Sequence, residues 1–136
     1  MKRVLSSLTA AGILLAAACA QAGKTDNLFT VETKSVPVKA GEKGKAEVQI
    51  KVKPEGHISN EAPFKATVTG KNVKLEKDKL AKPDAVYKDG GASAAIPFTA
   101  GEKGEGTVEA DLTFFMCSKE ICERHQRKVS IPVTVQ

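Results

Sequence analysis

The sequence predicts an all-β domain, an antiparallel β-sandwich of about seven strands, that follows an N-terminal export signal. Three observations lead to this prediction. Apolar and polar residues alternate with a period of two in several segments, as in strands with one buried face. Gly and Pro residues separate these segments. No stretch after residue 23 has the apolar spacing of a helix, and a length of 136 residues fits one domain.

The first segment is typical of a secretory signal peptide. Met1 is followed by two basic residues, then by the almost wholly apolar or small stretch 4–18 and by a run of small residues. This order directs export, and the segment is removed afterwards. At about 15 residues the apolar stretch is short for a transmembrane helix. We expect residues 1–19 to be the signal, residues 20–27 a short polar tether and residues 28–136 the folded domain.

Two cleavage sites compete in this segment. Residues 16–19 (Ala-Ala-Ala-Cys) resemble a bacterial lipobox, in which the cysteine becomes the lipidated first residue, although Leu15 lies one position too early for the usual pattern. The alternative is an A-x-A site with cleavage after Ala22. The lipobox is favoured, because a lone cysteine such as Cys19 has few other uses at this place. Ala20 then favours a periplasmic location with a lipid anchor in the outer membrane of a Gram-negative host.

Three later segments carry the strongest strand pattern. Val48, Ile50 and Val52 share one face of segment 46–53, and the apolar residues of two C-terminal segments alternate in the same way. Weaker patterns complete the prediction, which in chain order is 28–34, 46–53, 64–69, 73–76, 92–98, 107–116 and 129–135. Residues 74–80 fit a single helical turn at most, because Pro83 would end it.

Composition and charge exclude nucleic acid as a partner. Aromatic residues make up 4% of the chain, with no Trp and one Tyr, so a stacking platform for single strands is not expected. The net charge of +5 falls to +3 when Lys2 and Arg3 leave with the signal. Neither that charge nor an exported location favours a steered nucleic-acid partner. We expect no cofactor.

Cys117 and Cys122 remain after the signal is removed, and an exported protein is permitted to form disulfides. The pair brackets the connection between two predicted strands, and a turn there brings the Cα atoms within the bonding range of about 4.4–6.8 Å. A closed loop of about six residues stabilises a protein by only about 2 kcal/mol. Small bonds in exposed turns are among those more easily reduced. The spacing alone leaves both a structural and a redox-active disulfide open.

Three features together resemble a known family. They are residues 56–63 (Gly-His-Ile-Ser-Asn-Glu-Ala-Pro), the late cysteine pair within 117–122, and the closing strand 129–133. On these features, residues 28–136 resemble the N-terminal periplasmic domain of the thiol:disulfide interchange protein DsbD, an immunoglobulin-like sandwich. The chain departs from the family pattern after Cys122, where Glu123 and Arg124 replace the usual Pro.

The resemblance implies that Cys117 and Cys122 are a catalytic pair that cycles between dithiol and disulfide, with Cys122 as the attacking thiol. The partners it implies are a separate membrane electron donor and thioredoxin-like envelope proteins. His57 is a lesser candidate. It either lies near the cysteines and tunes their pKa, or only forms hydrogen bonds within a turn.

Two other functions stay open. The first is a non-catalytic envelope lipoprotein with a structural disulfide, whose edge strands bind a partner. The second is a Cu(I) site, because Met116, Cys117, Cys122 and His125 offer thioether, thiolate and imidazole groups within ten residues. Against the metal site, Met116 continues the apolar face of its strand, and His125 is interpreted as a solvated loop residue.

Overall fold

The computed structural model describes residues 23–136 of the chain. The predicted signal, residues 1–19, and the predicted lipidation site, Cys19, lie outside the described residues. Among residues 23–136, no helix is both long and apolar enough to cross a membrane. The two helices in this range are short 3-10 turns, η1 (Asp26–Leu28) and η2 (Lys82–Asp84).

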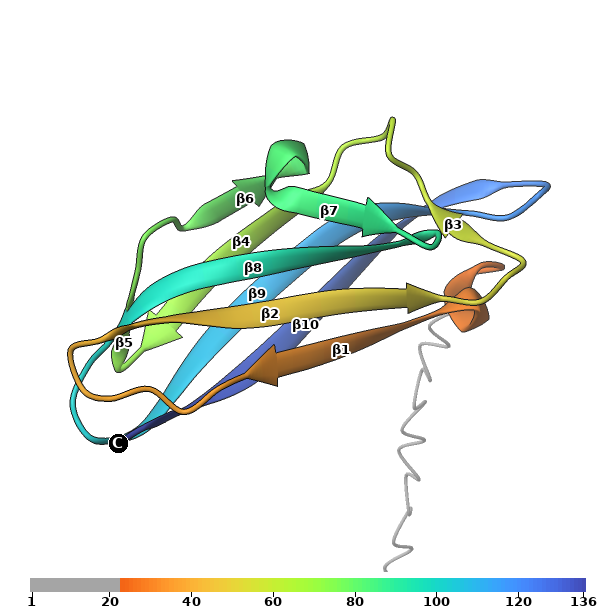
Figure 1. The fold of residues 1–136 in the computed structure, drawn as a ribbon. Coiled ribbons are helices and arrows are strands. Elements are labelled where there is room, and N and C mark those ends of the chain that lie inside the picture. The colour runs from red at the N-terminus through yellow and green to blue at the C-terminus, as the bar shows by residue number, and fades with distance from the viewer. Residues whose placement is uncertain (1–22) are drawn as a thin grey trace, which may run out of the picture.

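Two antiparallel sheets pack face to face (Figure 1). The first sheet has the order β1-β2-β8, with both β5 and β7 on the far edge of β8. Its strands are β1 (Phe29–Ser35), β2 (Lys43–Val52), β5 (Val73–Leu75), β7 (Ala85–Lys88) and β8 (Gly91–Ala100). The second sheet has the order β10-β9-β4-β6, with β3 also paired to β9. Its strands are β3 (His57–Ile58), β4 (Lys65–Lys71), β6 (Lys79–Ala81), β9 (Gly104–Cys117) and β10 (Cys122–Val135).

The architecture is an immunoglobulin-like antiparallel β-sandwich, which confirms the predicted fold class. All seven predicted strands are present, and the short strands β3, β6 and β7 come in addition. Residues 74–80 form no helical turn, because they are divided between β5 and β6. Short strands of two to four residues are too brief to show a period in the sequence.

The core lies between the two sheets, where the inward positions of the long strands are apolar. Phe98 of β8 and Phe114 of β9 are its largest fully buried members, and each is 0% exposed. Full burial of such a side chain stabilises a protein by about 1.5–3 kcal/mol. The pattern of burial therefore confirms the alternation from which the strands were predicted.

Strand β10 begins at Cys122, seven residues before the predicted start at residue 129. The inward positions of its first half are Glu123, His125 and Arg127, and apolar residues take over only from Val129. Polar side chains at inward positions hide the alternation that would have revealed the strand. These polar side chains form part of the site described below.

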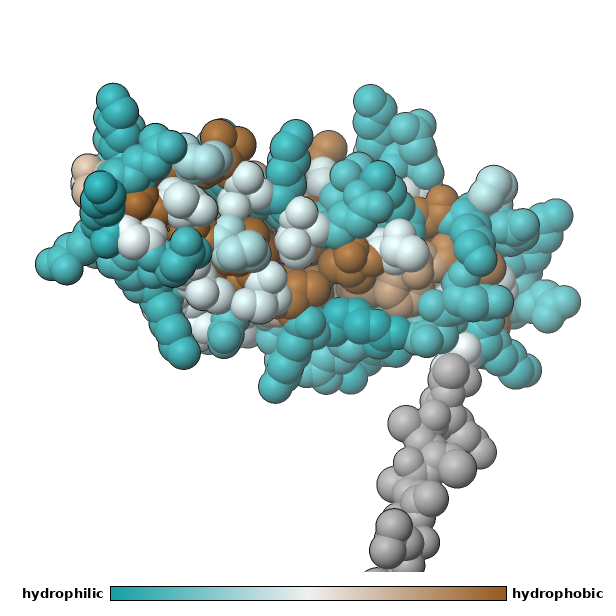
Figure 2. Space-filling model, turned by 90° about the horizontal axis from the view of Figure 1, so that it is seen from below, coloured by the Kyte–Doolittle hydropathy of each residue, from teal (hydrophilic) through white to brown (hydrophobic). Residues whose placement is uncertain are grey.

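Strands β1 and β10 are neighbouring edges of the two sheets. The Ser35 hydroxyl donates to the Pro132 carbonyl, and Val38 forms a parallel bridge with Val135. The chain after β1 thus crosses from the first sheet to the second and covers the end of β10. Seen from below, apolar surface shows in the middle of the molecule between long polar side chains (Figure 2).

Candidate functional site

The cysteine pair lies at the tip of the β9–β10 hairpin. Cys117 ends β9, Cys122 begins β10, and the two face each other in register with Cα atoms 4.0 Å apart. Their sulfurs are joined, so the predicted disulfide is confirmed. In the turn itself, the Ser118 N–H donates to the Ile121 carbonyl at 2.7 Å. The cysteines therefore occupy a non-hydrogen-bonded position of the ladder, where facing Cα atoms approach most closely, to about 4.5 Å.

The two sides of the disulfide differ in exposure. Cys117 is 3% exposed, whereas Cys122 is exposed to solvent. The turn beside Cys122 is held by Ser118, whose hydroxyl accepts the amide N–H groups of Glu120 and Ile121, both at 3.2 Å. Ile121 is an apolar side chain that stays 39% exposed next to the bond. A reactant in solution therefore meets the Cys122 side of the disulfide first.

His57 lies beside this disulfide. It begins β3, and its register partner in β9 is Cys117. Residues that face each other in an antiparallel pair project from the same face of the sheet, with Cβ atoms about 4.5–5.5 Å apart. His57, Cys117 and Cys122 therefore share the outer face of the second sheet. The structure thus places His57 next to the pair, which is one of the two alternatives raised from the sequence.

A small hollow borders His57, and neither cysteine lines it. Its lining includes Asn60, Gly90 and Tyr87 of β7. The Tyr87 hydroxyl is buried and makes no hydrogen bond to any residue from 23 to 136. Burial raises the pKa of this phenol above its ordinary value.

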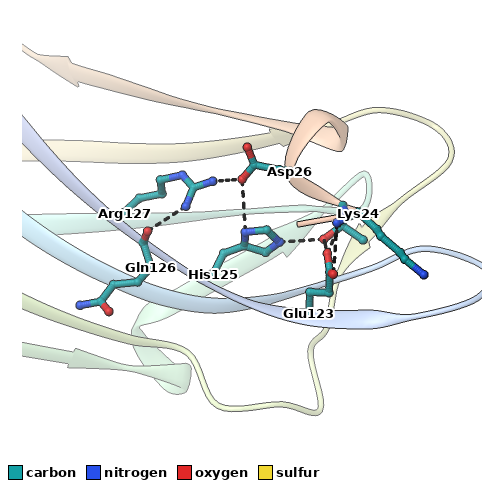
Figure 3. A network of polar contacts seen from close by, with 7 residues as sticks. Lys24, Asp26, Glu123, His125, Gln126 and Arg127 are labelled. Atoms are coloured by element: carbon teal, nitrogen blue, oxygen red, sulfur yellow. Dashed lines mark hydrogen bonds and ion pairs between the residues drawn. The ribbon is translucent and has the colours of Figure 1, made fainter. Parts of the chain in front are cut away.

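A polar network on the inner face of β10 holds the start of the folded chain (Figure 3). The Thr25 amide and hydroxyl both donate to the Glu123 carboxylate at 2.7 Å, and the Lys24 amide donates to it at 3.1 Å. The Thr25 hydroxyl oxygen also lies 2.7 Å from Nε2 of His125. We call the contacts of residues 24–26 with Glu123, His125 and Arg127 the N-terminal clamp.

The clamp assigns the proton of neutral His125. An ionised Glu123 carboxylate can only accept hydrogen bonds. The Thr25 hydroxyl has one proton, so its single hydrogen-bond donation is made to Glu123. The Thr25 oxygen then accepts from His125, whose proton must lie on Nε2. The Nδ1 atom is left without a proton and lies 3.7 Å from Oδ1 of Asp26.

Arg127 and two aromatic rings complete the surroundings of His125. The Arg127 guanidinium forms an ion pair with Asp26 and lies 5.1 Å above the ring of Phe29. The His125 ring contacts Phe29 edge-on and stacks with Phe114, with centroid distances of 4.8 and 5.8 Å. Two aromatic rings and one hydrogen bond therefore hold this imidazole on several sides.

The interpretation of His125 as a solvated loop residue is wrong. His125 lies within β10 and is 6% exposed, because it takes an inward position of that strand. The end of the predicted tether also differs, since Thr25 is 0% exposed and residues 24–27 lie against the sandwich. Residues 20–22 of the tether lie outside the described part.

The residues considered for a Cu(I) site are not brought together. Met116 and His125 face the interior, whereas Cys117 and Cys122 project from the outer face and are joined to each other. Within residues 23–136, no three His, Cys, Asp or Glu side chains are grouped so as to hold a metal ion.

The stability of the domain is expected to fall as the pH drops below about 6.5, the ordinary pKa of histidine. Burial, and then the nearby Arg127 guanidinium, lower the pKa of His125, while Asp26 and Glu123 oppose this less strongly. The unfolded chain therefore binds a proton before the folded one does, so stability is full above that pH and declines below it. Urea unfolding at pH 7.5 and 5.5 measures the difference.

The variant His125→Gln should reduce this difference, because an amide can donate to Thr25 but does not titrate. His57→Gln is the matched control, since His57 is exposed and is the only other histidine. Hydrogen bonds from the Thr25 hydroxyl and amide lower the pKa of Glu123 below its ordinary value. The stability that Glu123 contributes is therefore lost only at lower pH, as the pH falls below about 4.5. An equal pH dependence in His125→Gln and in the unaltered protein would contradict the assignment.

The clamp residues were not found from the sequence. Thr25 and Glu123 are 98 positions apart, and no motif joins them. A weak signal existed in the polar residues Glu123, His125 and Arg127, which alternate with exposed ones just as strand residues do. That alternation points to a strand only when polar inward positions are allowed.

The geometry defines an immunoglobulin-like sandwich with a disulfide at a hairpin tip, and comparison with known proteins adds similarity of fold. No protein-family model and no curated protein matches the chain. WR4, a member of the MSP family of C. elegans, has 8% identity and a TM-score of 0.41, over 80% of this chain and 98% of that one. The PapD-like domain 7 of human CEP192 has 8% identity and a TM-score of 0.43, over 96% and 98%.

A third similar structure is AggA, the major subunit of aggregative adherence fimbriae type I from Escherichia coli. It has 11% identity and a TM-score of 0.36, over 79% of this chain and 94% of that chain. These values concern the fold and carry no information on activity. The resemblance to the DsbD domain stays a prediction from the sequence.

Proposed function

We propose that this chain is an exported thiol–disulfide exchange module. In this proposal the Cys117–Cys122 pair carries electrons between a membrane reductase partner and thioredoxin-like envelope proteins. The chain is held at the periplasmic side of the outer membrane by a lipid on Cys19. The observation that carries the proposal is the unequal exposure of a disulfide at the tip of a hairpin: Cys122 is exposed and Cys117 is 3% exposed.

The position of the bond supports exchange over a purely structural role. It joins two residues that the β9–β10 ladder already pairs, and β9 and β10 have 14 residues each. A cross-link over a sequence separation of five removes little entropy from the unfolded chain and stabilises by about 2 kcal/mol. A bond that adds so little stability is free to open and close without loss of the fold.

The exposure gives each sulfur a role. A thiolate of a reduced partner attacks the sulfur of Cys122, and the Cys117 sulfur leaves as a thiolate that takes up a proton. A second partner thiol then resolves the mixed disulfide, so the partner is oxidised and this chain becomes a dithiol. In the next step the Cys122 thiolate attacks an oxidised client, and Cys117 displaces the client as a dithiol. Two electrons pass in each step.

His57 has a place in this scheme. It stands opposite Cys117 on the same face of the sheet. A protonated imidazole there would favour the Cys117 thiolate as it leaves, which is how neighbouring cations activate cysteine pairs. We propose His57 as the group that tunes Cys117.

The proposal is tested by the reduction potential of the Cys117–Cys122 pair. The potential is expected to lie above about −300 mV, the value below which structural disulfides typically fall. It is measured by equilibrating the purified domain with defined thiol buffers and counting free thiols. A potential below that value would contradict exchange and leave an envelope protein with a structural disulfide. The dithiol form is expected to be less stable to urea by only about 2 kcal/mol.

A further inference from the structure

The beginning of the folded chain and the disulfide lie at the same end of the sandwich (Figure 1). The N-terminal clamp joins them, because Lys24 and Thr25 bind the carboxylate of Glu123, and Glu123 directly follows Cys122. The fit is close at Gly23 as well, where an added Cβ would come within 2.9 Å of a Glu123 oxygen. Residues 23–26 are therefore held beside the exposed cysteine.

The opposite end of the sandwich is far from this point. Strands β9 and β10 each have 14 residues, which at about 3.4 Å per residue gives about 45 Å of length. The turn between β8 and β9, with the exposed side chain of Lys103, lies at that far end. The clamped residue Thr25 is therefore near the disulfide and far from Lys103.

The chain between the anchor and the clamp is short. Thr25 is six residues from Cys19. An extended chain spans at most about 3.6 Å per residue, so no conformation of this segment places Thr25 more than about 22 Å from Cys19. Without the clamp, the first fixed residue would be Leu28, which packs against the core and whose carbonyl accepts the Lys53 N–H. Leu28 is nine residues from Cys19, so the reach would grow to about 32 Å.

We propose that the N-terminal clamp turns the disulfide end of the sandwich toward the membrane that holds the lipid on Cys19, so that Cys122 reacts with thiols presented at the membrane surface. This inference rests on the proposed function and on the proposed lipid anchor. The partner it assigns is a membrane-bound dithiol protein whose reactive sulfur lies near the bilayer surface, within reach of Cys122 when Thr25 is held at most about 22 Å from Cys19. A clamped domain reaches such a partner without unfolding or long diffusion.

The test measures which end of the anchored domain faces the bilayer. Lipidated full-length protein is placed in phosphatidylcholine vesicles that carry a quencher on their head groups. A fluorophore is attached by azide–alkyne coupling to an azide-bearing amino acid introduced in place of Lys119 at the hairpin tip or of Lys103 at the far end. This coupling involves no thiol, so the Cys117–Cys122 disulfide stays intact during labelling. Quenching is expected to be several-fold stronger at position 119 than at position 103.

The clamp is then opened by Glu123→Ala, which removes the acceptor of three hydrogen bonds. This variant is expected to lose most of the difference between the two positions. Glu120→Ala is the matched control: it makes the same change in the same hairpin, and the Glu120 carboxylate has no hydrogen bond or ion pair to the described residues. The control is expected to keep the full difference.

Equal quenching at positions 119 and 103 would overturn the inference. So would a purified protein whose mass shows no lipid on Cys19. Neither result affects the reduction potential, which is measured in solution without a membrane. A failure of the orientation and a failure of the proposed exchange activity are therefore seen in separate experiments.

Discussion

Replacing Phe114 with alanine is expected to lower the free energy of unfolding by about 3–5 kcal/mol. Phe114 is 0% exposed and contacts both Phe29 and His125, with ring centroids 5.1 and 5.8 Å away. Truncation removes the buried ring and leaves a cavity between the core and the clamp, so both the transfer free energy and the ring contacts are lost. Urea unfolding at pH 7.5 measures the loss.

Phe115→Ala is the matched control, because it removes the same side chain from the next residue of β9. Phe115 takes an outward position and is only partly buried, so its loss should cost clearly less. If the two variants lost equal stability, the assignment of inward and outward faces at this end of β9 would be wrong. The Phe114→Ala variant should also weaken the protection of the Thr25 amide from hydrogen exchange.

The second large effect is expected in the single-cysteine variants. Cys117→Ser leaves an exposed thiol at Cys122, which should form a stable mixed disulfide with an oxidised thiol reagent or partner. Cys122→Ser leaves only Cys117, which is 3% exposed and must wait for local opening. Each tenfold difference in rate between the variants corresponds to about 1.4 kcal/mol of opening free energy.

The rates are measured by mass spectrometry after timed exposure to an aromatic disulfide. Cys117→Ser is expected to react at least about tenfold faster than Cys122→Ser. A free energy of about 1.4 kcal/mol for the local opening that exposes Cys117 is enough to give this ratio. Both variants lack the disulfide, so they share its effect on stability and serve as controls for each other. Equal rates in the two variants would contradict the assignment of Cys122 as the attacking sulfur, whatever the reduction potential of the pair.

The strands that could be predicted are those whose inward residues are apolar. Segment 46–53 and strand β2 (Lys43–Val52) coincide within three residues, since Val48 and Ile50 face the core. The cysteine spacing likewise predicted a bond across a turn, and the structure confirms it. One further signal was present but unused: Asp89 and Gly90 both have positive φ, 52° and 78°, and Asp-Gly is the usual sequence of a two-residue hairpin. That pair would have revealed β7.

The remaining parts of the site depend on contacts that no local pattern contains. His125 is buried because Thr25, about 100 residues away, supplies a hydrogen-bond partner and Phe29 supplies an aromatic face. The position of His57 beside Cys117 depends on the register of a two-residue strand. Such placements arise from tertiary packing, which overrides what a short polar segment prefers by itself.

The short separation of the two cysteines also affects how the protein matures. A hairpin with a four-residue turn closes in about 1–10 μs, long before β1 can be recruited to the sheet from the other end of the sequence. The two sulfurs are therefore brought together early in folding, and residues 23–136 contain no other cysteine with which to form a wrong pair. The disulfide can therefore form before the long-range steps of folding, and it does not trap the chain in a wrongly paired state.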